Sequence, residues 1–197
     1  MNAPARRLQG DVALGTTFAV ALVLALLAQW NLQLTFRRVE HPVALGTANL
    51  EADPEVVRGW YAQLIEQGTY LQMIRTELVD IPWAILLGAT LISLYRFVGG
   101  LLRRIHPPVS SWLVRWAPLA AVGPGFDLVE NAFSLAMLTD PFGFPDWWAL
   151  AHVVASWLKI IGAVAAASTG VTLTVIALVS GRRSRKTTDA PQDLPSP

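Results

Sequence analysis

The sequence contains no cysteine, and only 15% of its 197 residues are charged. The lack of cysteine excludes disulfides, thiolate metal sites and cysteine nucleophiles, and it leaves the redox compartment open. Ordinary soluble domains carry about 25% charged residues. The formal net charge is only +1, and the basic residues form no continuous stripe, so no nucleic-acid partner is expected.

Hydrophobic residues make up 53% of the chain and gather in four long runs. A bilayer core needs about 20 apolar residues per spanning helix, and only helices or closed barrels satisfy the backbone there. The sequence therefore predicts an all-α membrane protein, a four-transmembrane-helix bundle in one membrane domain over residues 1–181. Its spans are expected at about 12–30, 81–98, 117–138 and 148–179.

The first run could instead be a secretory signal peptide, because Arg6 and Arg7 precede it. Its apolar part is longer than the ~7–15 residues of a signal peptide, and no small-x-small cleavage site follows. A true span or a signal anchor is therefore the favoured interpretation.

Basic residues alternate between the ends of the runs and predict orientation by the positive-inside rule. The segment between the third and fourth runs, residues 139–147, has no lysine or arginine. Four arginines in the first outer loop oppose the assignment, but acids outnumber them there. We expect a multi-pass protein of the cell (inner) membrane with both termini cytoplasmic, marked by Arg6, Arg7, Arg96, Arg103, Arg104, Arg115, Arg182, Arg183, Arg185 and Lys186.

The outer loop, at about residues 35–79, and the C-terminal tail carry their own signals. Asp53-Pro54-Glu55 predicts a helix start, and Gly68 predicts its end. This short amphipathic helix lies on the membrane surface or caps the bundle, and the surface position is favoured. Thr69 and Gln72 predict a capping box for the next helix.

Residues 182–197 predict a disordered cytoplasmic tail. Its basic start is interpreted as a stop-transfer flank rather than a lipid-binding segment.

The third run carries Asp127, Glu130 and Asn131 at spacing i, i+3, i+4, on one face of a helix. Gly123-Pro124-Gly125 precedes them, and proline flanked by glycines predicts a kink or break. A break would place both acids near the start of a helix, where the dipole favours negative charge. The pattern indicates either a buried polar site or a proline kink alone.

The fourth run carries Lys159, which lies roughly 16 Å from Trp148 at a helical rise of ~1.5 Å per residue. A lone charge at that depth costs about 2.5–3.5 kcal/mol on insertion scales. We therefore predict that Lys159 pairs with Asp127 or Glu130. Two acids facing one base also predict that one acid is protonated at neutral pH unless a cation or water intervenes.

His152 and Ser156 share the face of Lys159 at spacing i, i+4, i+7, and Asp80 begins the second run on the same side. These residues extend the candidate binding cluster. For His152 alone, an interfacial hydrogen-bonded histidine is favoured over a ligand or base, and for Asp80 a helix cap is equally compatible. No metal is expected, because Lys159 competes for the carboxylates and the histidines are scattered. No cofactor is expected either.

Gly162, Ala166 and Gly170 repeat every four residues on the fourth run. Such a stripe of small residues permits close helix packing. Packing inside the bundle is the favoured interpretation, and a homo-oligomer formed through this stripe is the alternative.

The run Asp127, Glu130 and Asn131 also resembles an Asp-x-x-Glu-Asn motif in uncharacterised bacterial four-helix integral membrane proteins. The resemblance extends to the segment from Leu50-Glu51 to Trp60, to Asp80 and to Lys159. It covers most of the chain through short motifs. It implies the four-helix architecture and the choice of polar residues, but no reaction.

Two functions remain open from the sequence. In the first, the cluster binds or handles protons, a small polar molecule or a lipid headgroup, as an enzyme or a carrier. In the second, the protein is a structural or accessory membrane subunit whose cluster only locks helix packing. No nucleophile–base set is recognisable, so catalytic residues are not assigned. The expected partners are the lipid bilayer and, under the first function, a small-molecule or lipid ligand.

Overall fold

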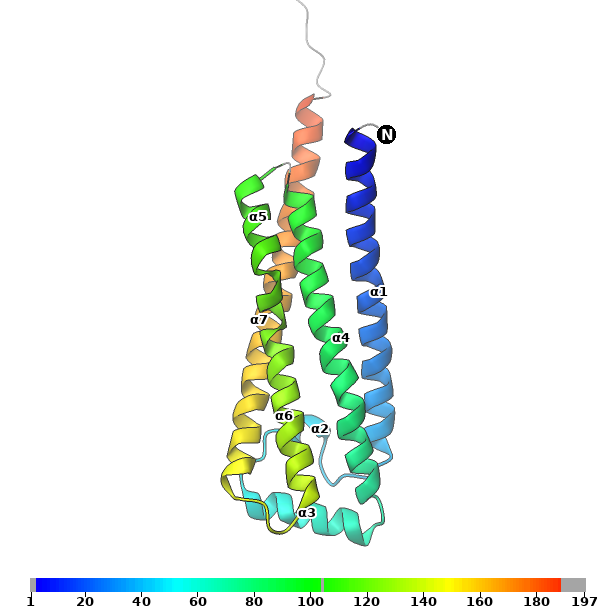
Figure 1. Ribbon diagram of the computed structural model, residues 1–197, viewed down its shortest axis with the longest axis vertical. Helices are drawn as coiled ribbons and strands as arrows, with labels where there is room; N and C mark the ends of the chain where they lie inside the picture. Colours follow the sequence, from blue (N-terminus) through cyan, green and yellow to red (C-terminus); the bar gives the residue numbers. More distant parts are fainter. Residues whose placement is uncertain (1–2, 104, 189–197) are drawn as a thin grey trace, which may run out of the picture.

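The computed structural model describes residues 3–103 and 105–188, and this part of the chain is helical without any strand (Figure 1). Three long helices run alongside a column of three shorter segments. Two further short helices lie at the end of the molecule opposite residues 3 and 188 (Figure 1). The elements are α1 (Ala3–Arg37), α2 (Leu45–Ala48), α3 (Pro54–Glu66), α4 (Tyr70–Leu102), α5 (Pro107–Trp116), the 3-10 helix η1 (Ala117–Ala121), α6 (Val122–Thr139) and α7 (Trp147–Thr188).

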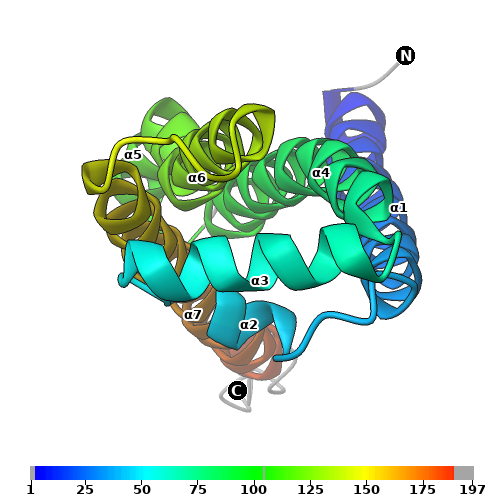
Figure 2. The ribbon, with the colours of Figure 1, turned by 90° about the horizontal axis from the view of Figure 1, so that it is seen from below.

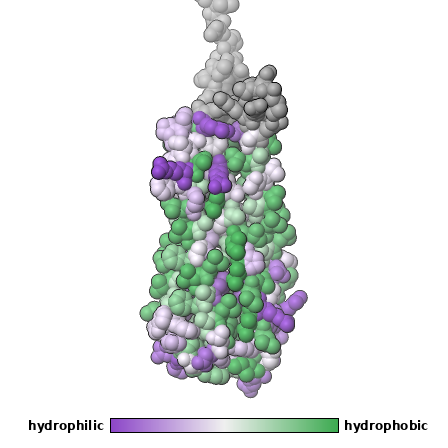
Figure 3. Space-filling model, in the orientation of Figure 1, coloured by the Kyte–Doolittle hydropathy of each residue, from purple (hydrophilic) through white to green (hydrophobic). Residues whose placement is uncertain are grey.

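Within the described residues, three helices are long and apolar enough to cross a membrane: Gly10–Arg37, Tyr70–Leu102 and Trp147–Ser180. They contain the first, second and fourth predicted spans. Their outward side chains are largely apolar, and apolar residues cover the middle of the face in Figure 3 while hydrophilic residues lie towards its two ends. This confirms the prediction of an all-helical chain with apolar helices of membrane-spanning length.

The third predicted span coincides with η1 and α6, and α6 is not among the three candidates. Its α-helix has only 18 residues and carries Asp127 and Glu130. The helical column starts earlier than the predicted span, at Pro107 of α5. An irregular stretch does occur near Gly123-Pro124-Gly125, but it is the 3-10 turn directly before these residues, which themselves lie in the first turns of α6.

Helices α6 and α7 approach each other closely at two glycines. A Cβ atom on Gly162 would lie 2.8 Å from Cα of Gly123, so any side chain there would collide with the neighbouring backbone. Farther along α7, the Ala166 carbonyl accepts a hydrogen bond of 3.1 Å from Tyr95, and Gly170 faces Leu94. The small-residue stripe is thus occupied by α6 and α4 of the same chain. Association of copies through it stays a prediction.

Helix α3 crosses the end of the bundle, with α2 beside it (Figure 2). It begins as the sequence predicts: the Asp53 carboxylate accepts a hydrogen bond of 2.9 Å from the Glu55 amide, and Pro54 is the first helical residue. Gly68, with φ of 75°, ends the turn that follows. The predicted capping box is wrong, because the Thr69 hydroxyl makes no capping bond and Gln72 donates to the Thr35 carbonyl instead.

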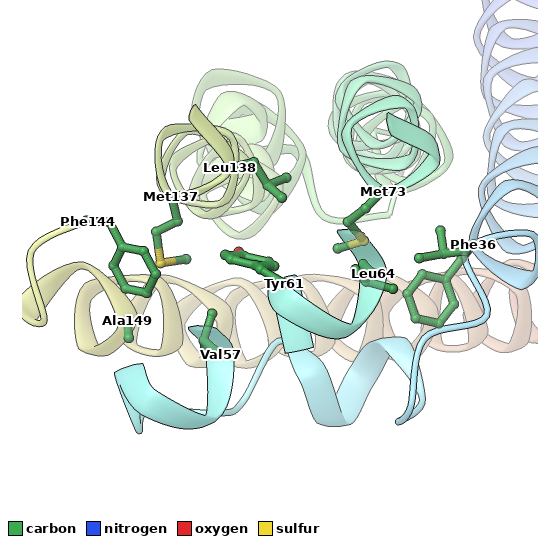
Figure 4. Packing of buried hydrophobic residues seen from close by; sticks show 10 residues of the cluster. Phe36, Val57, Tyr61, Leu64, Met73, Met137, Leu138, Phe144 and Ala149 are labelled. Carbon is green, nitrogen blue, oxygen red and sulfur yellow. The ribbon is translucent and has the colours of Figure 1, made fainter. Parts of the chain in front are cut away.

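Buried apolar side chains fasten α3 to the bundle (Figure 4). Val57, Tyr61 and Leu64 form the inner face of α3. They pack against residues from α1, α4, α6, α7 and the α6–α7 loop, and the whole cluster consists of Phe36, Val39, Val57, Tyr61, Leu64, Met73, Met137, Leu138, Phe144 and Ala149. The outer-loop helix is therefore a cap on the bundle, which was the less favoured of the two predicted positions. We call residues 41–68, which include α2 and α3, the cap.

Helix α7 continues to Thr188, so helical backbone extends beyond residue 182, where the tail was predicted to begin. Residues 189–197, the rest of that predicted tail, lie outside the described residues.

Candidate buried acid–lysine site

Lys159 of α7 contacts two acids of α6 with its single ammonium group. Its Nζ lies 2.8 Å from Oδ1 of Asp127 and 2.6 Å from Oε2 of Glu130. Both acids are almost fully buried, with 1% and 2% of their surface exposed. The predicted ion pair is therefore present, and Lys159 contacts both acids instead of only one.

Helical spacing explains why these groups meet. Asp127, Glu130, Asn131 and Ser134 follow one another at i, i+3, i+4 and i+7, so one face of α6 carries all four, and each is buried. The close approach of α6 and α7 at their glycines brings this face within reach of the lysine. The local sequence thus sets both the face and the distance.

His152 and Ser156 of α7 also lie beside this cluster. His152 Nε2 lies 3.9 Å from Oε1 of Glu130, which is beyond hydrogen-bond distance, and Ser156 lies beside the same carboxylate. The Ser156 hydroxyl donates to the His152 carbonyl at 3.0 Å. Glu130 therefore has the lysine on one oxygen and the histidine near the other.

Helix α4 adds two more carboxyl groups. Asp80, which the sequence marked as either a cap or a site residue, lies inside α4, buried and beside Asn131. It is therefore not a helix cap. Glu77 lies one turn nearer the cap and beside Ser134 of α6. Four buried acids consequently surround one lysine.

Three polar atoms of this cluster are buried with neither a hydrogen-bond nor an ion-pair partner: Asp80 Oδ1, Asp127 Oδ2 and Asn131 Nδ2. Their residues are between 1% and 8% exposed. A buried polar atom without a partner costs about 1–3 kcal/mol. Because the three atoms belong to residues facing one another across α4 and α6, this side of the cluster is incomplete by itself.

A cavity of about 20 Å³ lies between the cap and the acid cluster. Its floor is formed by Glu77, Ser134 and His152, and its roof includes Trp60 and Tyr61 of α3. A volume of this size holds about one water molecule. The cluster is therefore reached from the capped end through a space that excludes larger molecules.

Two of the titratable side chains that line this cavity, His41 and Tyr61, have shifted pKa values. Burial lowers the pKa of His41 from its ordinary value of 6.5, and a hydrogen bond to the Val43 carbonyl offsets this only in part. Burial, and secondarily the nearby Glu77 carboxyl, raises the pKa of Tyr61 well above its ordinary range. Both side chains are thus held neutral at neutral pH, whereas Glu51 is the acid from this end that also lines the cavity.

The sequence interpretation missed Glu77, Ser134 and the roof of the cavity. Glu77 stands three residues before Asp80, and Ser134 four after Glu130, so extending each helical face by one turn would have found both. No local signal marks Trp60 and Tyr61 as cavity residues, because they reach the site only through the folded cap.

The arrangement is suited to charge and proton chemistry. Among the described residues, no group of three or more histidine, cysteine or acidic side chains is arranged to hold a metal ion. Lys159 instead occupies the space between Asp127 and Glu130. Carboxyl groups beside an ammonium and an imidazole can exchange protons, and the cavity lets water approach them.

No protein-family model, curated protein or solved structure matches this chain. The resemblance to the bacterial four-helix membrane proteins therefore stays a prediction, and functional inference depends on the site itself.

Proposed function

We propose that this is a multi-pass protein of the cell (inner) membrane that spans the bilayer four times, with α5, η1 and α6 together forming the fourth crossing. Both termini are cytoplasmic in this proposal. Its support is the placement of the ends: the start of α1, the end of α4 and the end of α7 lie at one end of the molecule, with the cap at the other (Figure 1). The arginine-rich segments belong to the former end.

We further propose that the cluster binds and releases protons. The observation that carries this function is the excess of acids: Glu77, Asp80, Asp127 and Glu130 face one lysine. If all were ionised, the cluster would hold a net charge of −3 within an apolar bundle. Because unpaired charge is costly at this depth, uptake of protons is the least demanding way to reduce it.

The cavity favours protons over larger ligands. With room for about one water molecule, it admits neither a lipid headgroup nor an ordinary metabolite. Glu77 and His152 stand at its floor, and His152 lies near Glu130, which touches Lys159. A proton entering from the cap would meet these groups in that order.

Infrared titration of the purified full chain in detergent tests this function. We expect a band of protonated carboxyl groups at neutral pH that weakens as the pH is raised, and a smaller band in Glu77→Gln and Glu130→Gln. Glu66→Gln, which removes an exposed acid of α3, is the matched control and should leave the band unchanged. A spectrum without any such band at neutral pH would rule the proton-binding function out.

A structural or accessory subunit is the second candidate, favoured by one observation. Lys159 satisfies two acids of α6 at once, directly beyond the glycine contact of the same helices, which is an arrangement that fixes helix register. In that case the charges serve packing alone. Reproducible co-purification with one protein partner, together with an absent titration, would support it.

A further inference from the structure

We propose that Asp80, Asp127 and Asn131 form a binding subsite for one small monovalent cation, between α4 and α6. The inference deepens the proposed proton-binding function, because the cation would occupy the carboxyl groups in exchange for a proton. It depends on two independent observations, namely the buried charge excess and the buried polar atoms that lack partners.

Two carboxylate oxygens of the cluster are available to a ligand. Lys159 occupies Oδ1 of Asp127 and Oε2 of Glu130. The other oxygen of Asp127, Oδ2, makes no hydrogen bond, and neither does Oδ1 of Asp80 from the facing helix. The lysine thus occupies only one oxygen of Asp127, and Oδ2 is left for a ligand.

Asn131 supplies the third group. It is 1% exposed, and its side chain reaches Asp80, although Nδ2 lies outside ordinary hydrogen-bond geometry with any partner. The two ends of an amide are nearly equal in size, and rotation by half a turn exchanges its nitrogen for its oxygen. The subsite then offers three oxygens, two of them from carboxylates.

The charge of the ligand follows from its surroundings. Asp80 is faced by Asp127, Glu130 and Lys159, and Glu77 lies one turn away on its own helix. Divalent ions in proteins take six to eight oxygen ligands or keep several waters, and no third acid joins the two aspartates in a metal-holding group among the described residues. A single positive charge reduces the excess of buried negative charge and does not need six to eight oxygen ligands. The ligand class is therefore a monovalent cation.

The route of access is the cavity beneath the cap. Glu77 lines the cavity and precedes Asp80 by one helical turn on α4. A small ion leaving the cavity would therefore pass one carboxyl group before reaching the subsite. Sodium and lithium are smaller than potassium and suit this passage better.

The experiment measures thermal unfolding of the purified full chain in detergent during titration with NaCl, LiCl or KCl. N-methyl-glucamine chloride keeps the ionic strength constant, so general salt effects cancel. We expect the unfolding midpoint to rise saturably with sodium or lithium at alkaline pH. At acidic pH the apparent affinity should weaken by about tenfold per pH unit, because one proton competes with one cation.

Asp80→Asn and Asn131→Leu should each abolish the cation-dependent rise, and Glu66→Gln should retain it. Asn131→Leu leaves all acids in place, so its loss of response separates the subsite from the overall charge. An unchanged midpoint with every ion in the unsubstituted protein would overturn the inference. A cation-dependent rise in Asp80→Asn and Asn131→Leu equal to that of the unsubstituted protein would also overturn it.

Failure of this inference is distinguishable from failure of the proposed function. The infrared titration is carried out in N-methyl-glucamine chloride, where protons are the only small cations. A carboxyl band without any sodium or lithium response would retain the proton function and discard the cation subsite.

Discussion

The ammonium nitrogen of Lys159 lies 2.6 Å from Oε2 of Glu130 and joins α7 to α6 in the buried part of the bundle. The same nitrogen contacts Asp127, so one positive charge serves two negative ones. A pair of this kind is rarely a net gain over apolar packing, yet removing one partner strands the other. The cluster is therefore most sensitive to loss of the lysine.

We expect Lys159→Met to lower the free energy of unfolding in detergent by about 3–5 kcal/mol, because it leaves two buried acids without their counter-charge. Adding Asp127→Asn or Glu130→Gln to Lys159→Met should recover part of the loss. A double-mutant cycle measures this coupling. The acid whose removal rescues more is the stronger partner of the lysine.

The matched control is Arg103→Met, which breaks the exposed ion pair between Arg103 and Asp11, 2.7 Å apart. Exposed pairs contribute about 0–1 kcal/mol, so this variant should be close to the unsubstituted protein. Equal losses in Lys159→Met and Arg103→Met would show that burial gives the lysine no special role.

Gly123→Ala should destabilise the contact between α6 and α7. The added methyl carbon would lie 2.7 Å from the Gly162 carbonyl carbon and still closer to the Ala163 amide nitrogen, both of which are backbone atoms. Overpacking of this kind costs about 1–3 kcal/mol. The free energy of unfolding in detergent is the measurement.

Gly125→Ala is the matched control on the same helix, because a methyl carbon there meets nothing within 4 Å. Alanine favours helix by up to about 1 kcal/mol relative to glycine, so this variant should be neutral or more stable. If both variants behaved alike, the close approach of the helices would not limit packing.

The cap should loosen at acidic pH because of His41, whose ring lies 5.1 Å from that of Trp60. Burial lowers the pKa of His41 below 6.5, so the detached cap binds the proton first. Stability of the cap is therefore complete above about pH 6.5 and falls as the pH drops towards the lowered value.

Hydrogen exchange of the α3 amides across this pH range measures the effect. His41→Phe keeps an aromatic ring beside Trp60 but cannot titrate, so it should flatten the pH dependence of α3 beyond the intrinsic exchange rate. Amides in the middle of α7 serve as the internal reference. A pH response of α3 that persists in His41→Phe would assign it to another group.

The pairing of Lys159 with Asp127 and Glu130 could be predicted because helical spacing and the cost of buried charge are both readable in the sequence. Glu77 was missed although it stands three residues before Asp80 on the same face, because the predicted span began at residue 81. Helix α4 begins at Tyr70, well before the apolar run, so hydropathy alone does not mark the turns that carry these acids. Hydropathy likewise gave a third span beginning at residue 117, whereas the column begins at Pro107.

The cap, too, could be predicted only in part from the sequence. Its helix start was predictable from Asp53 and Pro54, which act locally. Its position over the bundle depends on Tyr61 and Leu64 meeting residues of other helices, and no local pattern encodes those partners. The Thr69 capping box was wrong because Gln72 found a tertiary partner instead.

Arg58 fastens the cap to the α6–α7 loop. Its guanidinium lies 2.5 Å from Asp146, donates to the Phe144 carbonyl at 2.8 Å, and stands 4.7 Å above the Phe144 ring. Asp146 holds the pKa of Arg58 above its ordinary value, so the contact persists at every ordinary pH. Arg58→Met removes the charge and both hydrogen bonds together.

We expect Arg58→Met to speed hydrogen exchange in α3 and in residues 141–146. Hydrogen exchange in the part of α7 that follows Lys159 should be unchanged. Arg58→Lys should give an intermediate result, since a lysine keeps the charge but lacks the second nitrogen with which Arg58 also contacts Glu55. Arg38→Met, which changes an exposed arginine at the same end, is the matched control. If the cap guards the cavity, protons should also reach the buried acids faster in Arg58→Met, as a faster infrared response to a pH jump. An unchanged response with a loosened α3 would mean that protons enter the cluster by a route that bypasses the cap.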